Sequence, residues 1–108
     1  MFQPKIKIRL LGATDIRRAV PMRKAIEATR QAFAALSSGR ARVPPRTPIE
    51  VSPDAVALFM PAYLVGHPVG LGVKMVSVFP ANRDWGLPLI HALVVLADEA
   101  SGRPRGVL

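Results

Sequence analysis

The chain has 108 residues, of which half are hydrophobic and 20% are charged, and this length allows one domain at most. It contains no cysteine, which excludes disulfides, a thiolate nucleophile and a cysteine-ligated zinc site, and no apolar run approaches the roughly 18 to 20 residues of a membrane span. The formal net charge is +8, but the basic residues are spread along the chain rather than gathered among aromatics, so we expect neither nucleic acid nor a membrane as a partner and place the protein in the cytoplasm.

The first part of the chain predicts one strand followed by two helices. Residues 5–11 alternate basic and apolar side chains, which is typical of a short strand. Thr14 is a suitable N-cap and Asp15 a favourable first-turn residue, so we expect a short helix that ends near residue 20. A longer helix should then run to Gly39, because apolar residues recur at helical spacing: Met22, Ile26, Phe33 and Leu36. We expect this apolar stripe to pack on the sheet, although it could also form a groove for a partner.

The rest of the chain predicts strands and turns. Residues 43–51 contain three prolines and suit an edge strand. Three apolar runs predict longer strands, of which the last two should be buried on both faces: 55–65, 71–79 and 89–96. The expected connections are a turn at 52–54, a turn at 66–68, a loop at 80–88 with Trp85 near its tip, and a hairpin at 97–104 that leads into a strand at 105–108. Together these elements predict an α+β domain, with one long and one short N-terminal helix and a mixed, largely antiparallel sheet of about five or six strands.

Lys74 most needs an explanation, because it stands in the middle of an apolar strand. An unpaired ammonium is costly to bury, so Lys74 either reaches water at the end of a strand or faces a polar cavity that holds an anion. Arg46 follows Pro44-Pro45, which holds the backbone extended and fixes the direction in which the arginine leaves it. An arginine fork and a lysine that converged on one pocket would bind a carboxylate, and the lysine would also offer a transferable proton. The sequence leaves both readings of Lys74 open.

Six segments carry a pattern that extends over nearly the whole chain. In order they are Leu10-Leu11 with Thr14 to Met22, Ala25 to Gly39, Pro44 to Thr47, Met60 to Tyr63, Gly72 to Pro80, and Gly86 to Leu96. By these segments the chain resembles the N-terminal part of the ornithine cyclodeaminase/mu-crystallin family. The resemblance rests on all six segments occurring in the family's order.

The resemblance implies an NAD(P)-dependent oxidoreductase that acts on amino or imino acids. Its reaction would be the conversion of L-ornithine to L-proline and ammonia, or the related chemistry of alanine dehydrogenases and ketimine reductases. Arg46 matches the arginine that holds the substrate carboxylate, and Lys74 matches a lysine of the same pocket that pairs with the carboxylate and can exchange a proton. Met60 lies where family members line this pocket. Leu58 stands in the region where some ornithine-converting members carry a carboxylate, and this departure weakens the case for ornithine.

The cofactor, NAD or NADP, is expected to bind outside this chain. Gly70-Leu71-Gly72 precedes a strand and has no third glycine before a helix, so it is not a dinucleotide fingerprint. By resemblance, residues 1–108 are an incomplete N-terminal substrate-binding and dimerisation domain, the protein continues beyond Leu108 into a Rossmann domain, and two such sheets close face to face in a homodimer. No metal site is expected, because His67 and His91 lack carboxylates at ligand spacing.

Two other readings remain open. The first is a non-catalytic small-molecule binding protein like mu-crystallin, which keeps the same fold. The second is a truncated relic without function, since the isolated chain lacks the parts that the family uses for catalysis and is expected to be inactive. Sequence beyond residue 108 would separate these readings, because a glycine-rich nucleotide turn there favours an enzyme.

Overall fold

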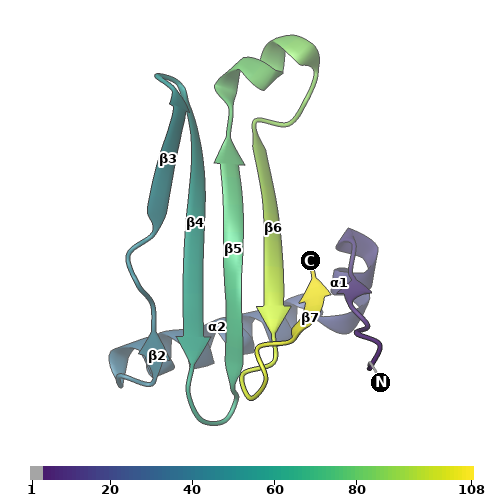
Figure 1. Cartoon of the computed structure of the whole chain (residues 1–108), viewed down its shortest axis with the longest axis vertical. Helices are drawn as coiled ribbons and strands as arrows, with labels where there is room; N and C mark the ends of the chain where they lie inside the picture. The colour runs from purple at the N-terminus through teal and green to yellow at the C-terminus, as the bar shows by residue number, and fades with distance from the viewer. Residues whose placement is uncertain (1–3) are drawn as a thin grey trace.

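A computed structural model describes residues 4–108 as two α-helices, one 3-10 helix and seven strands (Figure 1). In chain order the elements are β1 (Arg9–Leu10), α1 (Ala13–Ala19), α2 (Met22–Ser37), β2 (Ala41–Arg42), β3 (Thr47–Ser52), β4 (Ala55–Leu64), β5 (Gly70–Val78), the 3-10 helix η1 (Pro80–Trp85), β6 (Ile90–Ala97) and β7 (Pro104–Val107). No helix among the described residues is long and apolar enough to cross a membrane.

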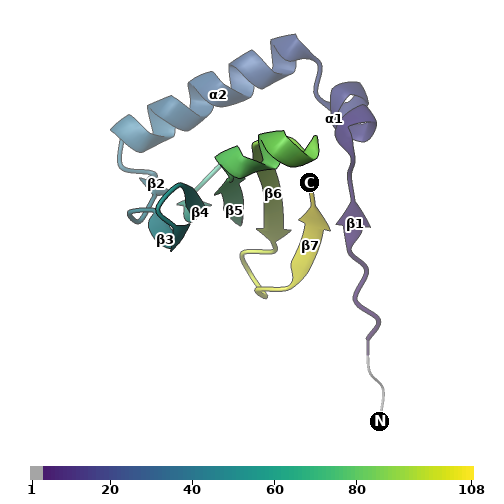
Figure 2. The ribbon, with the colours of Figure 1, turned by 90° about the horizontal axis from the view of Figure 1, so that it is seen from above.

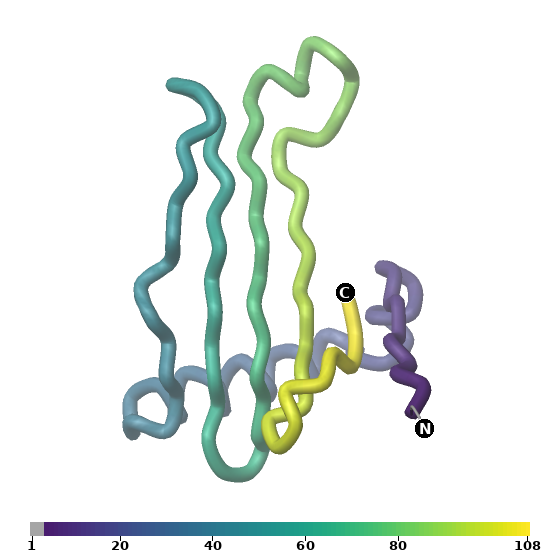
Figure 3. Tube along the Cα trace, viewed as in Figure 1, coloured from purple at the N-terminus to yellow at the C-terminus, as the bar shows by residue number. Residues whose placement is uncertain are grey.

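The seven described strands form one sheet in the order β1-β7-β6-β5-β4-β2, with β3 also paired to β4. The pairings are antiparallel except that of β1 with β7. β2 and β3 lie along the same edge of β4, and the chain leaves that edge between them (Figure 3). The predicted α+β domain with a mixed, largely antiparallel sheet is confirmed. Its strands number seven rather than five or six because β2 adds a short pairing to β4 ahead of β3.

Local side chains and glycines determine where the α-helices begin and end. The prediction of Thr14 as the N-cap of the first helix was wrong, because the cap is Gly12. The Gly12 N–H donates a hydrogen bond to the Asp15 carboxylate at 2.9 Å. The acid in the first turn thus caps the N-terminus of the helix. α2 ends as predicted, since Gly39 takes a φ of 79°, which lies in the left-handed region that favours glycine.

The apolar stripe of α2 stays largely open rather than packed on the sheet, contrary to the prediction from its spacing, although Phe33 and Leu36 line a cavity together with β4. Between 51% and 73% of each stripe residue is exposed: Met22, Ile26, Phe33 and Leu36. Figure 2 shows α2 crossing one side of the sheet, and the helix contacts the sheet through β2 at its C-terminal end. Ala35 is therefore the one buried residue of this helix.

The faces of the central strands are also open. In the single chain β6 is open, since Ile90 and Leu93 are 60% and 46% exposed, and burial of β6 on both faces requires the expected second sheet. The radius of gyration is 16.4 Å, against about 13 Å for a compact chain of this length. The exposed area is 8801 Å², against about 5,800 Å² for a compact protein of this mass. Both differences have the same cause, because no second layer within residues 4–108 covers the sheet.

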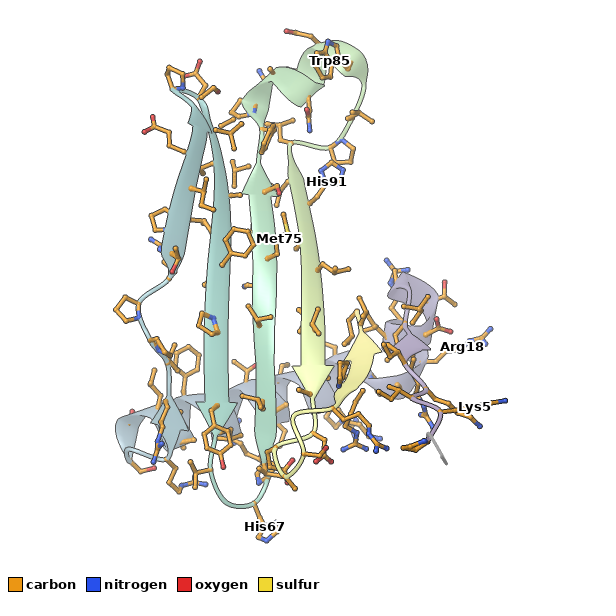
Figure 4. The ribbon with its side chains drawn as sticks, viewed as in Figure 1. Lys5, Arg18, His67, Met75, Trp85 and His91 are labelled. Carbon is orange, nitrogen blue, oxygen red and sulfur yellow. The ribbon has the colours of Figure 1, made fainter. Side chains whose placement is uncertain are left out.

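Two further segments differ from their predicted form. Residues 80–88 were expected to be a loop but contain η1, in which the buried Asn82 side chain donates a hydrogen bond to a backbone carbonyl six residues further on, at 3.0 Å. Trp85 lies near the tip of this segment, as predicted, and is 75% exposed (Figure 4). The strand expected at 5–11 pairs only at Arg9–Leu10, because its partner β7 has four residues.

Candidate functional site

Lys74 lies at the centre of the sheet rather than at the end of a strand. It is the fifth of the nine residues of β5, which runs between β4 and β6. Met60 is its direct partner in β4, and Val94 is its direct partner in β6. Paired residues of neighbouring antiparallel strands project from the same face, with β-carbons roughly 4.5 to 5.5 Å apart. Lys74 and Met60 therefore share one face of the sheet.

Arg46 continues this row on the other side of Met60. Thr47 pairs with Phe59 at the start of β3, and Arg46 immediately precedes this pair, so it lies next to Met60 just outside the ladder. Neighbouring strands are roughly 4.8 Å apart, which places the backbones of Arg46 and Lys74 about 10 Å from each other. We call Arg46, Met60 and Lys74 the cationic row. The residues singled out in the sequence thus occupy adjacent positions across three neighbouring chain segments.

No neighbour in the described chain neutralises the two cations of this row. Arg46 and Lys74 are exposed and Met60 is half-buried. Within residues 4–108, the ion pairs join other groups, at Arg30 with Glu27 and at Arg105 with Asp98. The row therefore presents two uncompensated positive charges on one face, a planar guanidinium and a mobile ammonium. Such a pair can bind a small anion, and the guanidinium fork suits a carboxylate.

Apolar and small residues surround the cationic row on its own face. Side chains alternate along a strand, so residues two positions from each member of the ladder share its face: Leu58, Ala62, Gly72, Val76, Ala92 and Leu96. None of these residues is charged, which gives the site an apolar floor. Leu58 stands out in the sequence, and alternation about Lys74 gives Gly72 and Val76, whereas the residues of β4 and β6 follow from the strand pairing.

Gly72 brings β5 and β6 close together beside Lys74. A β-carbon at this position would lie 2.7 Å from the backbone oxygen of Val95, which is closer than such atoms tolerate. Gly70-Leu71-Gly72 therefore lies inside a strand and serves its packing. In the described chain, Gly12 is the one glycine that follows a strand and precedes a helix, so residues 4–108 carry no glycine-rich turn of the dinucleotide-binding type.

The two histidines lie at opposite ends of the sheet. His67 is in the turn between β4 and β5, and His91 is near the start of β6 (Figure 4). Within residues 4–108, no three or more His, Asp or Glu side chains are placed to hold a metal ion together. The structure thus gives the histidines no shared ligand.

Comparison with known proteins finds relatives over nearly the whole chain. The family model described as the ornithine cyclodeaminase/mu-crystallin family matches residues 7–108. An alanine dehydrogenase of Archaeoglobus fulgidus is 31% identical over 99 residues, which is 92% of this chain and 30% of that protein.

Solved structures show the same likeness. The Thermococcus litoralis Delta(1)-pyrroline-2-carboxylate reductase, in complex with NADH and L-proline, aligns with a TM-score of 0.85 and 38% identity, over 93% of this chain and 31% of that one. An archaeal alanine dehydrogenase dimer with bound NAD aligns with a TM-score of 0.83 and 31% identity, over 93% of this chain and 30% of that one. The chain therefore spans about 30% of the length of the relatives that it matches.

Proposed function

This chain belongs to the ornithine cyclodeaminase/mu-crystallin family, and from that premise we propose that residues 1–108 are the N-terminal substrate-binding and dimerisation portion of a longer NAD-dependent oxidoreductase. Its substrate is an amino or imino acid that is held by its carboxylate. The proposal draws on the named activities of the relatives, alanine dehydrogenase and Delta(1)-pyrroline-2-carboxylate reductase.

The observation that carries the proposal is the cationic row. Arg46 approaches from the edge of β4 and Lys74 from β5, with Met60 between them. A carboxylate above Met60 would accept two parallel N–H bonds from the Arg46 fork and a third from Lys74 Nζ. Hydrogen bonds to charged groups contribute about 1.5 to 3 kcal/mol each, which is enough to orient a small amino acid.

The surroundings of the row favour a substrate with a neutral side chain. Glu50, the one acidic residue of the seven described strands, lies four residues from Arg46, about 13 Å along the strand. A side-chain ammonium such as that of L-ornithine would find no carboxylate in the strands beside Lys74. We therefore favour L-alanine, or L-proline and its cyclic imino acid, over L-ornithine.

We assign NAD or NADP to a part of the protein outside this chain, because residues 4–108 carry no glycine-rich turn of the dinucleotide-binding type. When bound, a nicotinamide accepts hydride from the α-carbon of an amino acid or returns it to an imine. The residues of this chain position the substrate and exchange a proton with it. Arg46 and Lys74 fix the carboxylate, and Lys74 Nζ can exchange a proton with the substrate nitrogen.

We also propose a homodimer formed through the sheet face opposite the cationic row. Phe59, Met75 and Leu93 pair across β4, β5 and β6 on that face, and Met75 and Leu93 remain 40% and 46% exposed. Two copies closing face to face would bury this surface, and the similar archaeal alanine dehydrogenase was solved as a dimer. We place the protein in the cytoplasm, because a chain without cysteine suits a reducing compartment.

Assay of the longer protein that carries this chain tests the proposed function. With NAD or NADP, it should oxidise L-alanine or L-proline, or reduce the corresponding imino acid, with L-ornithine as a poorer substrate. The readout is the absorbance of the reduced nicotinamide. Binding of L-proline without turnover would favour a non-catalytic protein like mu-crystallin, and the absence of both binding and turnover would contradict the proposal.

A further inference from the structure

A second concentration of positive charge lies at the β1 and β7 edge of the sheet. The structure has a cavity of about 840 Å³ there, between the N-terminal segment, β7 and the hairpin that precedes β7. Its lining includes five cations, which we call the basic groove: Lys5, Lys7, Arg9, Arg103 and Arg105. The fold therefore gathers one third of the 15 lysines and arginines of the chain in one concave place.

Alternate residues of the N-terminal segment line this cavity, and three of these four residues are basic: Lys5, Lys7, Arg9 and Leu11. Lys7 and Arg9 line the cavity, whereas Ile8 and Leu10, which alternate with them, are 48% and 77% exposed. A segment that merely covered the sheet edge would do the reverse, because burial favours apolar side chains and water favours cations. The alternation thus places three cations of this segment at the cavity.

The carboxylates of the cavity do not cancel this charge. Asp98 and Glu99 are the acidic residues of its lining, which leaves an excess of three positive charges. Asp98 is already engaged, because it accepts hydrogen bonds from Ala100 and Ser101 at 2.9 to 3.0 Å and lies 4.0 Å from Arg105. The Ser101 hydroxyl, followed by its backbone N–H, lowers the pKa of Asp98. The other cations of the basic groove have no ion-pair partner within residues 4–108.

We propose that the basic groove binds a small ligand that carries two or more phosphate groups. Lys7 and Arg9 are two residues apart, which is roughly 6.6 Å along an extended chain, and Arg103 and Arg105 have the same spacing on the adjoining segment. The groove thus offers several donors to one extended anion, and lysine and arginine are the common partners of phosphate oxygens. Among the described residues, no aromatic side chain lines it, so it lacks the stacking platform that single-stranded nucleic acids use.

This site is separate from the cationic row. Gly70 lines the groove and shares the sheet face of Lys74, but it lies four residues away, about 13 Å along the strand. A polyphosphate in the groove and a carboxylate at Lys74 can therefore bind together. The proposal also stands independently of the oxidoreductase reaction.

Calorimetry of the 108-residue chain with inorganic tripolyphosphate, at about physiological ionic strength, tests this site. The double variant Lys7→Gln/Arg103→Gln should weaken binding at least about tenfold, because it removes two charge-assisted contacts. Arg23→Gln/Lys24→Gln removes the same two charges from the exposed face of α2 and should change the dissociation constant less than about twofold. The variant Lys7→Arg/Arg103→Lys keeps both charges and should bind within about threefold of the original chain.

Three results would overturn the proposal. The first is no heat of binding with the unmodified chain. The second is equal weakening by the groove variant and the α2 variant, which would indicate general attraction to a basic protein. The third is tighter binding of a single-stranded oligonucleotide than of tripolyphosphate, which would make the groove a nucleic-acid surface. If Lys7→Gln/Arg103→Gln does not fold, the charge-conserving variant still decides, since loss of binding by a folded chain that keeps both charges contradicts a site built on charge.

Discussion

Met60 lies directly opposite Lys74 in the ladder between β4 and β5. A polarisable apolar side chain therefore stands next to an ammonium in the middle of the sheet, and Arg46 follows on the other side of Met60. The two functions of a small amino-acid site are thus divided among neighbours, with charge for the carboxylate and apolar surface for the carbon skeleton. The consequences for binding, turnover and assembly can be measured separately.

Replacement of Arg46 tests the carboxylate contact. In the longer enzyme, Arg46→Ala should raise the Michaelis constant for the amino-acid substrate at least about tenfold, because a hydrogen-bonded charge contributes about 1.5 to 3 kcal/mol. Arg42→Ala is the matched control, since Arg42 lies on the same edge but pairs with Tyr63, whose side chain projects from the opposite face. An unchanged Michaelis constant for Arg46→Ala would remove this residue from the site.

Replacement of Lys74 separates anchoring from proton exchange. Lys74→Met should lower turnover by at least about a hundredfold if Nζ exchanges a proton during the reaction, with a smaller change in the Michaelis constant. Lys74→Arg keeps the positive charge but is a poor proton donor, so it should recover substrate binding and leave turnover low. Equal losses of binding and turnover in Lys74→Met would make the lysine a carboxylate anchor only.

Replacement of Met75 tests the dimer face. Met75→Glu should halve the native mass in solution, from twice the chain mass of 11.6 kDa to the monomer value, because a carboxylate would be buried without a partner. Val20→Glu is the control, since Val20 is 41% exposed and Met75 is 40% exposed, but Val20 caps α1 rather than lying on the sheet. Sedimentation measures the native mass of both variants. A dimer that persists in Met75→Glu would show that the interface lies elsewhere.

Two glycines of β5 should respond differently to the same substitution. Gly72→Ala places a β-carbon 2.7 Å from the Val95 backbone oxygen, so it should lower the free energy of unfolding by about 1 to 3 kcal/mol. Gly70→Ala meets no heavy atom within 4 Å and should change that free energy by less than about 0.5 kcal/mol. Denaturant titration compares them, and equal effects would mean that β5 and β6 do not approach as closely as described.

The register of the cationic row could be predicted from the sequence. The turn predicted at 66–68 centres on His67, and reflection about that residue pairs Met60 with Lys74. The turn predicted at 52–54 centres on Pro53, and reflection there brings Arg46 beside Met60. The observed ladders pair Met60 with Lys74 and Thr47 with Phe59, next to Arg46, because tight turns between antiparallel strands determine which residues meet. The long helix and the strands β4 to β6 were predictable for a related reason, since their apolar runs are long and regular.

What covers each apolar surface could not be predicted from the same patterns. Apolar periodicity in α2 and β6 shows that a surface needs a partner, but not that the partner lies within residues 4–108. The stripe of the helix and Leu93 are exposed, so their partners do not lie within residues 4–108. The cap at Gly12 was missed because the carboxylate of Asp15 satisfies it from the first turn. The basic groove was missed because the basic residues are spread along the chain, and it is the fold that brings the N-terminal segment beside Arg103 and Arg105.

The measurement that tests the cationic row most directly is an NMR titration of the 108-residue chain with L-proline, with L-prolinamide, which lacks the carboxylate, as the comparison. If the row binds a carboxylate, resonances of Arg46, Met60 and Lys74 should shift with L-proline and not with L-prolinamide. In the double variant Arg46→Ala/Lys74→Met, L-proline should no longer shift the resonances of Met60. Equal shifts with both compounds, or shifts with L-proline that persist in the double variant, would contradict carboxylate recognition by this row.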